Sequence, residues 1–356
     1  MKVGLFRAFP DPYRRSMEIY ADRLLSEVRP LLREGDMIED YLPVPVRTAP
    51  TWRRYWDQYV RYQRLAARAR ADVHHIVDPG YAHLVYSLPA DRTIVTFHDA
   101  AVPLTPGVRR RTRLAFRYSL TGLRRARMVL TDSRAARQDL LGLVDYPEER
   151  IRVIPLGIDE SFQVLPERDA LRASLGLAGP TLLHVGHNQA YMNMEGIFRA
   201  LDFLVREARL DARLIKVGDR FTPEQEALLG RLGLAARVTH LGRVPLGRLP
   251  DIYNSADVFL YPVLHAGFGL AALEAMACGV PVLASARGSL SEVLGDAPVS
   301  VDPEDPRLMA ERLAALLTDQ ALRARCRARG LEQAGRYSWA ETARQVLSVY
   351  RQVADA

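Results

Sequence analysis

The sequence predicts an α/β protein of two domains, each built on a parallel β-sheet. The 356 residues are about twice the length of a common single domain. Short apolar runs typical of buried strands alternate with amphipathic stretches along the chain, which is the pattern of parallel α/β folds. A loop around residues 156–166 divides this alternation into two series, so we expect one sheet on each side of it.

The predicted elements follow from these two series. In the first series the expected strands are Lys2–Phe6, Val73–Val77, Thr93–Phe97, Met128–Thr131 and Ile151–Pro155, with helices at Ser16–Leu32 and Arg110–Arg127. In the second series they are Thr181–Val185, Ala212–Val217, Val238–Leu241, Val258–Tyr261, Val280–Ala284 and Val299–Val301. Helical spacing of apolar residues predicts helices at Met194–Arg206, Thr222–Leu232, Gly247–Asn254, Ala271–Ala277, Asp305–Leu317 and Trp339–Ala354.

The composition is that of an ordinary globular protein, with 48% hydrophobic and 26% charged residues. The apolar run at the N-terminus is too short for a signal peptide, and no stretch has the roughly 18–20 apolar residues of a spanning helix. Cys278 and Cys326 show no disulfide or metal-ligand spacing. We therefore expect a cytoplasmic protein.

The positive charge is unevenly placed. Residues 1–160 hold 27 basic and 20 acidic residues, whereas the remainder holds 22 of each. Eight arginines and no acidic residue occupy the stretch Arg109–Arg127. This stretch is either a solvated helix face or a surface for an anionic membrane or a phosphorylated acceptor. Nucleic acid is not an expected partner, because no nucleic-acid-binding module accompanies the cluster.

The segment 51–64 combines arginines with aromatic residues at helical spacing. These aromatic residues are Trp52, Tyr55, Trp56, Tyr59 and Tyr62. We interpret them as a stripe that faces the core. The alternative is a membrane-interface helix or a wall of the acceptor site, since Trp and Tyr suit an apolar–polar boundary.

The strongest functional signal is the segment Gly267-Phe-Gly-Leu-Ala-Ala-Leu-Glu274. It follows a predicted strand and reads as a glycine-bearing turn that leads into a short helix. Glycines let backbone N–H groups approach a ligand closely, and a helix N-terminus favours phosphate. The Glu274 carboxylate, about one and a half turns into the helix, can accept hydrogen bonds from both hydroxyls of a ribose. We therefore expect a nucleotide-diphosphate site here.

At this segment the sequence resembles the retaining GT-B glycosyltransferases of family 4, also called group 1. Further motifs that fit the family are Val153-Ile-Pro-Leu-Gly-Ile-Asp159, Val95-Thr-Phe-His-Asp99, Leu183-His-Val-Gly186 and Ser338-Trp339. The resemblance implies two Rossmann-like parallel-sheet domains facing across a cleft. The expected boundaries are 1–160 for an acceptor domain, 161–337 for a nucleotide-sugar domain, and 338–356 for a helix that crosses back to the first.

The resemblance also implies roles for individual residues. Glu274 would bind the ribose, and the backbone around Gly267, Phe268, Gly269 and Leu270 would hold the diphosphate. His98 would contact the donor sugar near the reacting carbon. Further expected nucleotide-binding residues are Asn193 and Arg220. Tyr81 and His83 are expected to contact the acceptor, with simple loop packing as the alternative for both.

The sequence departs from the family pattern at positions that usually carry charge. The glutamate expected eight positions before Glu274 is Ala266, and the expected arginine and lysine after the strand at 181–185 are His187 and Met192. Preorganised cations normally stabilise the charge that builds up on a leaving diphosphate. His187 and His265 are therefore expected to act catalytically as replacement cations, because a neighbouring phosphate raises the pKa of a histidine.

The expected function is retaining transfer of a hexose from a nucleotide-diphosphate sugar to an acceptor hydroxyl, in the synthesis of cell-envelope polysaccharide or glycolipid. No cofactor is expected, and no Asp-x-Asp pair is present to clamp a metal onto the diphosphate. The acceptor would be a saccharide or a lipid-linked molecule, with the protein peripheral at the inner membrane face. The alternatives are a nucleotide-sugar-binding protein of this fold with weak or lost transferase activity, and a sugar-nucleotide epimerase or phosphorylase. The nucleotide base, the donor sugar and the oligomeric state stay open.

Overall fold

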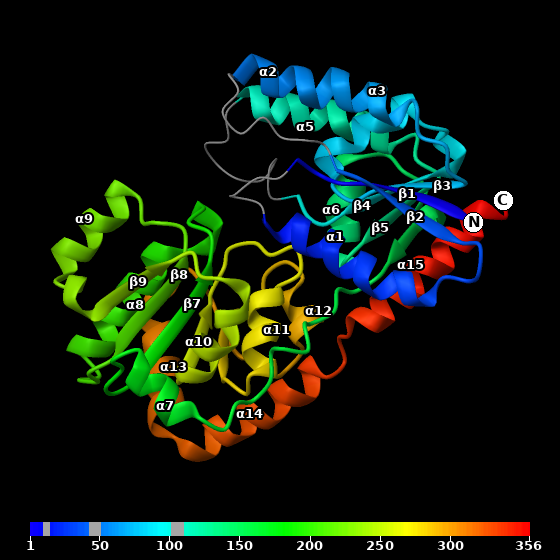
Figure 1. The fold of residues 1–356 in the computed structure, drawn as a ribbon. Coiled ribbons are helices and arrows are strands. Elements are labelled where there is room, and N and C mark those ends of the chain that lie inside the picture. The colour runs from blue at the N-terminus through cyan, green and yellow to red at the C-terminus, as the bar shows by residue number, and fades with distance from the viewer. Residues whose placement is uncertain (10–14, 43–50, 101–109) are drawn as a thin grey trace. The chain divides into compact units, whose positions relative to one another are not determined.

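The computed structural model describes residues 1–9, 15–42, 51–100 and 110–356 (Figure 1). It divides into two compact units. The first unit comprises Met1–Gly157 together with Trp339–Ala356, and the second comprises Ile158–Ser338. The described part of each unit contains a six-stranded parallel sheet with flanking helices. The fold class expected from the sequence, two parallel-sheet α/β units, is thereby confirmed.

The sheet of the first unit has the strand order β2-β1-β3-β4-β5-β6. Its strands are β1 (Lys2–Phe6), β2 (Met37–Tyr41), β3 (Val73–Ile76), β4 (Thr93–Phe97), β5 (Met128–Thr131) and β6 (Ile151–Val153). All but β2 follow the predicted apolar runs. The run Met-Ile-Glu-Asp-Tyr of β2 mixes apolar and charged residues because this strand lies at the sheet edge and none of its residues is fully buried.

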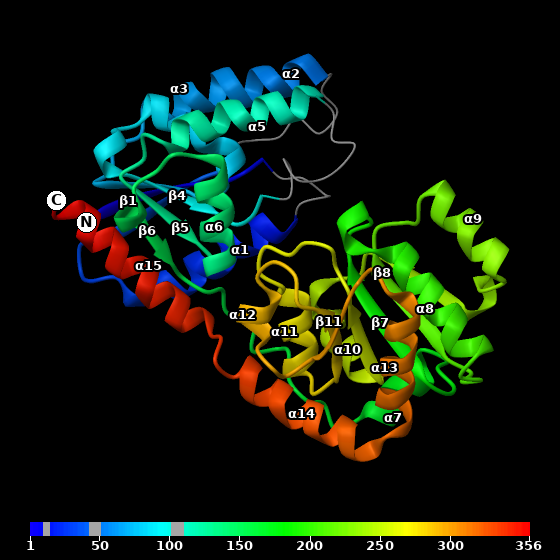
Figure 2. The ribbon, with the colours of Figure 1, turned by 180° about the vertical axis from the view of Figure 1, so that it is seen from behind.

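Helical segments cover this sheet and extend beyond it (Figures 1 and 2). The longer ones are α1 (Arg15–Val28), α5 (Arg110–Leu123), α6 (Arg134–Leu143) and α15 (Trp339–Ala354). The segments α2 (Thr51–Trp56), the π-helical η2 (Asp57–Arg61) and α3 (Tyr62–Ala66) run consecutively, and η3 (Pro79–Ser87) follows β3. Single turns are η1 (Arg29–Leu31), η4 (Ala90–Arg92) and η5 (Glu148–Arg150). In both views α2 and α3 lie alongside α5.

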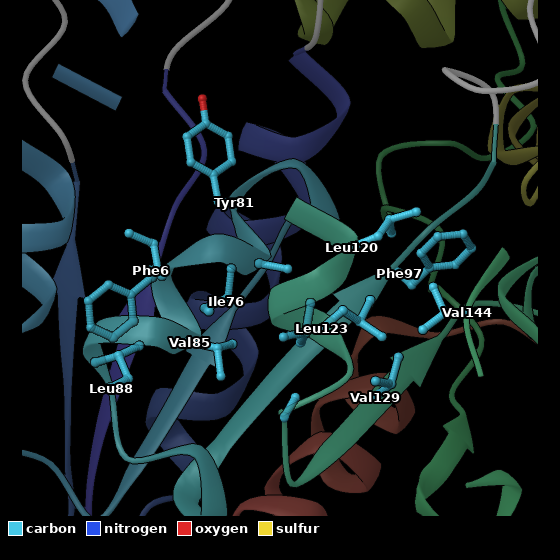
Figure 3. Packing of buried hydrophobic residues seen from close by; sticks show 14 of the residues in the cluster. Phe6, Ile76, Tyr81, Val85, Leu88, Phe97, Leu120, Leu123, Val129 and Val144 are labelled. Atoms are coloured by element: carbon cyan, nitrogen blue, oxygen red, sulfur yellow. The ribbon is translucent and has the colours of Figure 1, made fainter. Parts of the chain in front are cut away.

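The core of the first unit lies between β1, β3, β4 and β5 on one side and η3, α5 and α6 on the other. Figure 3 shows Phe97 and Val129 of the strands on the side of Leu120 and Leu123 of α5, while Phe6 lies beside Val85 and Leu88. The contact of α5 with η3 is close, because a Cβ on Gly122 would lie 2.2 Å from the Ala82 carbonyl oxygen. Glycine at 122 is therefore what lets this helix reach the core.

The C-terminal helix α15 completes the first unit. It packs against α1, and its predicted apolar face of Val346, Leu347, Tyr350 and Val353 is buried. The Tyr350 hydroxyl also bonds His75 Nδ1 of β3 across 2.6 Å. Residues far apart in the sequence therefore share one buried layer.

The sheet of the second unit has the order β12-β11-β10-β7-β8-β9. Its strands are β7 (Thr181–Gly186), β8 (Arg213–Gly218), β9 (Val238–Gly242), β10 (Val258–Tyr261), β11 (Val282–Ser285) and β12 (Val299–Val301). Its helices are α7 (Arg168–Ser174), α8 (Met194–Arg206), α9 (Pro223–Leu232), α10 (Leu249–Ser255), α11 (Leu270–Ala277), α12 (Leu290–Leu294), α13 (Pro306–Thr318) and α14 (Gln320–Ala334). The single turns are η6 (Ala190–Met192), η7 (Ala235–Arg237) and η8 (Leu246–Arg248).

Local sequence explains where helices of this unit begin. Thr222 and Gln225 form a reciprocal capping box at the start of α9, and Asn193 caps α8 by accepting from the Gly196 amide across 3.2 Å. Asp305 and Asp319 cap α13 and α14 in the same way. The caps at Asn193 and Thr222 end two of the strand-to-helix loops of the candidate site.

Candidate functional site

The expected nucleotide site lies in the second unit, at the carboxyl edge of its sheet. β11, β10, β7 and β8 are neighbours and run parallel, so the loops that follow them emerge at the same edge. These loops are 286–289, 262–269, 187–193 and 219–222. We call them the edge loops.

Hydrogen bonds join the edge loops into one row. The amide of Leu264 donates to the Tyr191 carbonyl across 2.7 Å, and the Asn188 side chain donates to the Arg220 carbonyl across 2.7 Å. On the other side, the Ser289 amide donates to the Ala266 carbonyl across 3.2 Å. The loops therefore form a continuous rim rather than four separate segments.

The glycine-bearing turn sets the start of α11. Gly269 has φ +102° and occupies the N-cap position, where it supplies no side chain to cap the helix. A Cβ at this position would lie 2.6 Å from Leu290 Cδ2, so both the backbone conformation and the packing require glycine. The first turn of α11 thus keeps amide donors without a side-chain cap, which suits an anionic group. Phe268 is buried against Tyr337 and anchors the turn.

Glu274 lies on α11 with its carboxyl group enclosed by protein, although the residue retains some exposure. The Tyr253 hydroxyl of α10 donates to Glu274 Oε2 across 2.8 Å. Burial raises the pKa of the Glu274 carboxyl to about 7, and the bond from Tyr253 acts in the opposite direction. An enclosed carboxylate with one fixed donor is a suitable acceptor for ribose hydroxyls.

The edge loop 187–193 contains two of the departures from the family pattern. His187 Nδ1 lies 3.6 Å from Asp219 Oδ2, and Asp219 also pairs with Arg243 at 2.7 Å. Burial lowers the pKa of His187, although the nearby Asp219 raises it. His187 is therefore not held as a cation by the protein alone. The Met192 side chain is buried, with its methyl group 2.5 Å from the point that a Cβ on Gly186 would occupy.

A buried cation lies close by, from β8 rather than from the loop. The Lys216 ammonium donates to the carbonyl oxygens of Gly186 and Val217 across 2.6 and 2.8 Å. Its side chain is fully buried, and burial lowers its pKa to about 8. The carboxyl end of β7 thus lies beside a positive charge, although Lys216 has no surface open to a ligand.

Two residues expected to bind the nucleotide have other contacts. The Asn193 amide donates to the carbonyls of Pro262 and Pro303 across 3.0 and 2.6 Å while its oxygen caps α8. Its polar atoms therefore tie three segments together. Arg220 lies in the loop after β8 with an exposed side chain. Both stay predictions as ligand contacts, as does His265 beside the glycine turn.

In the first unit, His98 and Asp132 follow the neighbouring strands β4 and β5 and form a buried pair. His98 Nδ1 lies 2.6 Å from Asp132 Oδ2, and Nε2 lies 3.0 Å from the Val77 carbonyl oxygen. Burial alone would lower the pKa of His98, but Asp132 outweighs it and raises the pKa to about 9. Both ring nitrogens face acceptors, and the raised pKa favours the imidazolium with both N–H groups engaged. A bond from His98 to a donor sugar would require one of them to be released.

The two expected acceptor residues are packed inside the first unit. His83 is fully buried, with its ring nitrogens near the Ser119 hydroxyl and the Gln58 carbonyl at 3.2 and 3.3 Å. The Tyr81 ring is also buried, among Phe9 and Tyr62. Figure 3 shows its hydroxyl directed away from the other core side chains. These contacts are those of packed core residues, and the acceptor role of Tyr81 and His83 stays a prediction.

The aromatic stripe at 52–62 differs from its predicted orientation. Tyr62 is buried, as expected. The exposed fraction is 69% for Trp52 and 49% for Trp56. The interpretation of a wholly core-facing stripe is therefore wrong for the N-terminal half. That half lies on α2, where the following π-helical segment shifts the buried face so that Asp57 rather than Trp56 points inward.

The basic stretch forms an exposed surface on α5 and on the turn that follows it. Arg110, Arg111, Arg113, Arg117, Arg124 and Arg125 are exposed, and none forms an ion pair with another described residue. Leu114 and Tyr118 are exposed among them at 55% and 45%. Arg109 lies outside the described residues. α2 runs alongside α5 (Figure 1). We call the exposed arginines of this stretch, Leu114, Tyr118 and the exposed aromatic residues of α2 together the α2–α5 face. This face combines cations with large apolar groups.

In the part of the chain that the structure describes, no group of three or more His, Cys, Asp or Glu residues could hold a metal ion. Over the same residues, no helix has both the length and the apolar character required to cross a membrane.

Two residues of these sites escaped the sequence reasoning. Tyr253 lies 21 positions before Glu274 and carries no local signal. Asp132 carried a signal in the sequence, because it follows β5 directly, and β5 is the neighbour of β4, the strand that ends before His98. Adjacent parallel strands place the residues that follow them side by side, so the pair could have been found.

Known proteins with similar sequences match both units. The profile of group 1 glycosyl transferases matches residues 167–333, and that of glycosyltransferase family 4 matches residues 22–162. O-antigen chain mannosyltransferase B of Escherichia coli is 32% identical over 270 residues, which are 73% of this chain and 70% of that protein. D-inositol 3-phosphate glycosyltransferase of Xylanimonas cellulosilytica is 36% identical over 238 residues, which are 63% of this chain and 56% of that protein.

Solved structures with the same fold cover nearly the whole chain. Sucrose-phosphate synthase of Thermosynechococcus elongatus superposes with a TM-score of 0.82 at 22% identity over 99% of both chains. HepE of Anabaena in complex with UDP-glucose gives 0.77 at 19% identity, over 99% of this chain and 100% of that one. These likenesses show the GT-B fold. Together with the sequence matches, they establish that this chain is a glycosyltransferase of the group 1 family.

Proposed function

We propose that the protein transfers a sugar from a nucleotide-diphosphate sugar to an acceptor hydroxyl in the synthesis of a cell-envelope polysaccharide or glycolipid. The arrangement at α11 carries the proposal, since an uncapped helix start suits a diphosphate and an enclosed carboxylate suits the hydroxyls of a ribose. The mannosyltransferase named above acts on an O-antigen chain, and HepE was solved with UDP-glucose. Both relatives support this substrate class.

The proposed transfer retains the configuration of the sugar and uses no metal. The acceptor hydroxyl attacks the anomeric carbon from the leaving-group face while the bond to the diphosphate oxygen breaks. The hydroxyl proton passes to that phosphate oxygen, so no protein nucleophile is needed. The protein contributes positioning and the helix amides of α11, which stabilise charge on the departing diphosphate. His187 and His265 are the proposed added cations, because each lies at or beside a position that has lost a charged residue.

The proposed acceptor is lipid-linked or otherwise anionic, and the protein binds an anionic membrane surface through the α2–α5 face. Exposed Trp and Tyr side chains next to arginines that form no ion pair among the described residues suit the boundary between headgroups and acyl chains. Each arginine near anionic lipid contributes roughly 1 kcal/mol, so the cluster is sufficient for reversible binding.

A nucleotide-sugar-binding protein without transfer is the second candidate. Ala266 and Met192 favour it, because both side chains are buried and neither supplies the charge that the family pattern places there. In the experiment that separates the two, a thermal-shift screen with UDP-, GDP-, ADP- and dTDP-sugars comes first. Turnover with the stabilising donor and a lipid extract follows. Transfer or donor hydrolysis supports the enzyme, whereas binding without either supports the second candidate.

A further inference from the structure

Tyr253 is buried in the second unit, and its ring is fixed by aromatic neighbours. It is 0% exposed, and its ring centroid lies 5.7 Å from Phe162 and 5.5 Å from Phe259. A buried tyrosine hydroxyl requires a partner, and here that partner is Glu274 Oε2 at 2.8 Å. Because the ring is held by packing, its hydroxyl marks a fixed point for the carboxylate.

The bond occupies only one side of the Glu274 carboxylate. Among the described residues, no group donates to Oε1, and no cation forms an ion pair with Glu274. A carboxylate has about four acceptor positions, so three remain for a ligand. Tyr253 therefore orients the group without competing for the positions that two ribose hydroxyls need.

We propose that Tyr253 is the positioning residue of the ribose-binding carboxylate, and that its hydroxyl keeps Glu274 in the ionised form that accepts two hydrogen bonds. The inference rests on the proposed function, since it takes Glu274 as the ribose contact. It adds a residue on a different helix, α10, whose contribution is made only through Glu274.

The surroundings of Glu274 make its ionisation sensitive to this single bond. Burial raises the pKa of the carboxyl to about 7. The nearby titratable groups are Tyr253 and Cys278, the C-cap residue of α11, while Tyr261 of β10 interacts with Tyr253. From α14, Arg327 reaches Gly279 at the end of α11. Loss of the Tyr253 hydroxyl removes a group that favours the carboxylate, so the pKa of Glu274 rises further.

Nucleotide binding is then coupled to proton release from Glu274. A protonated carboxyl donates one bond itself and is a poor acceptor for two hydroxyls. Affinity should fall by about tenfold per pH unit below the midpoint and level off above it. Protonation of His187 or Lys216 has the opposite sign, because a cation strengthens diphosphate binding as the pH falls. The direction of the pH dependence therefore identifies the group.

The test is calorimetry of the full chain with the nucleotide sugar that gives the largest thermal shift, between about pH 5.5 and 8.5. A nucleotide sugar is used because its diphosphate lacks the terminal phosphate that titrates near pH 6 in a free nucleoside diphosphate. Tyr253→Phe is compared with wild type and with Tyr146→Phe. The control loses a buried hydroxyl that donates to the Ala126 carbonyl across 2.9 Å in the first unit.

We expect the binding affinity of wild type and of Tyr146→Phe to rise with pH. For Tyr253→Phe, the midpoint of this rise should lie at a higher pH. Its binding would be about tenfold weaker near pH 6.5 and much closer to wild type at pH 8.5. Glu274→Gln, which has no ionisable group at this point, should lose the pH dependence. A Tyr253→Phe loss that is equal at every pH, or pH dependence that persists in Glu274→Gln, overturns the inference alone. Failure of wild type to bind any nucleotide sugar overturns the proposed function with it.

Discussion

His98 and Asp132 form a charged pair inside the first unit, with 2.6 Å between Nδ1 and Oδ2. The other ring nitrogen of His98 faces the Val77 carbonyl at 3.0 Å. The protein thus keeps a histidine cationic far above the pH at which it would normally lose its charge. The residue is fixed in orientation before any ligand binds.

This pair predicts a dependence of stability on pH. The pKa of folded His98 is about 9 against an ordinary value of 6.5. The stabilisation is therefore complete below about pH 6.5 and is lost as the pH rises through 9, with a full size of about 3 kcal/mol. Asp132→Asn should abolish most of it. Urea denaturation of both proteins at several pH values between these limits should show a difference that shrinks as the pH rises.

The matched control for this series is His83→Gln. His83 is also buried, but burial lowers its pKa to about 4, so it is neutral throughout the range. Its replacement should cost the same free energy at each pH. An equally flat difference for Asp132→Asn would show that the His98–Asp132 pair is not ionic.

His187 and His265 give a prediction about catalysis. If they replace the missing cations, His187→Ala and His265→Ala should each slow donor hydrolysis and transfer by about ten- to a hundredfold, because a cation next to the leaving diphosphate lowers the barrier. Rates are measured with the donor found by thermal shift. Asp219→Asn is informative beside them, since it removes the carboxylate nearest His187 without removing the ring. Unchanged hydrolysis in both histidine variants would rule out compensation by these residues.

The α2–α5 face predicts salt-sensitive binding to anionic vesicles. Replacement of Arg111, Arg113 and Arg117 by Gln should weaken binding by about a hundredfold at low salt. Trp52→Ser should weaken it at both low and high salt, because its contribution is apolar. Vesicle flotation with and without anionic lipid measures both effects.

The control variant carries the same change in charge elsewhere. Arg231, Arg312 and Arg325 are exposed on helices of the second unit, and their replacement by Gln should leave flotation unchanged. Equal losses in the two triple variants would indicate a response to net charge alone. Absence of wild-type binding at low salt would remove the membrane surface from the proposed function.

The edge loops predict an unusual cost for one small substitution. Gly218 has φ +115°, and a Cβ there would lie 2.1 Å from the Gly186 carbonyl oxygen, the same oxygen that accepts from Lys216. Gly218→Ala should destabilise the protein by about 2–4 kcal/mol and weaken donor binding. Gly230→Ala, on α9 with open space around it, should instead stabilise by roughly 0.5–1 kcal/mol. Urea denaturation distinguishes these signs, and a tolerated Gly218→Ala would contradict the close approach of β7 and β8.

The fold was largely predictable because buried parallel strands are continuous apolar runs, such as Val258–Tyr261, and their spacing by helices is regular. β2 was not predicted, because an edge strand tolerates charged residues. α14 was not predicted, because its arginine-rich sequence buries only a narrow face that includes Cys326 and Gly330. In the site, the position of Glu274 was readable from the turn before it. Contacts such as Tyr253 to Glu274 depend on how α10 packs on α11, and no local pattern encodes that packing.

The discontinuity of the first unit has a consequence for how the chain acquires its structure during synthesis. The chain leaves this unit at Gly157 and re-enters it at Trp339, beside the Ile158–Ser338 bridge. The second unit is one uninterrupted stretch and can fold as soon as it leaves the ribosome. The first unit must wait, since Tyr350 and the rest of the α15 face are translated after the second unit. Until then, the apolar surface of α1 and β3 that α15 will cover is exposed, so nascent chains are most vulnerable to aggregation and proteolysis at the half that is made first.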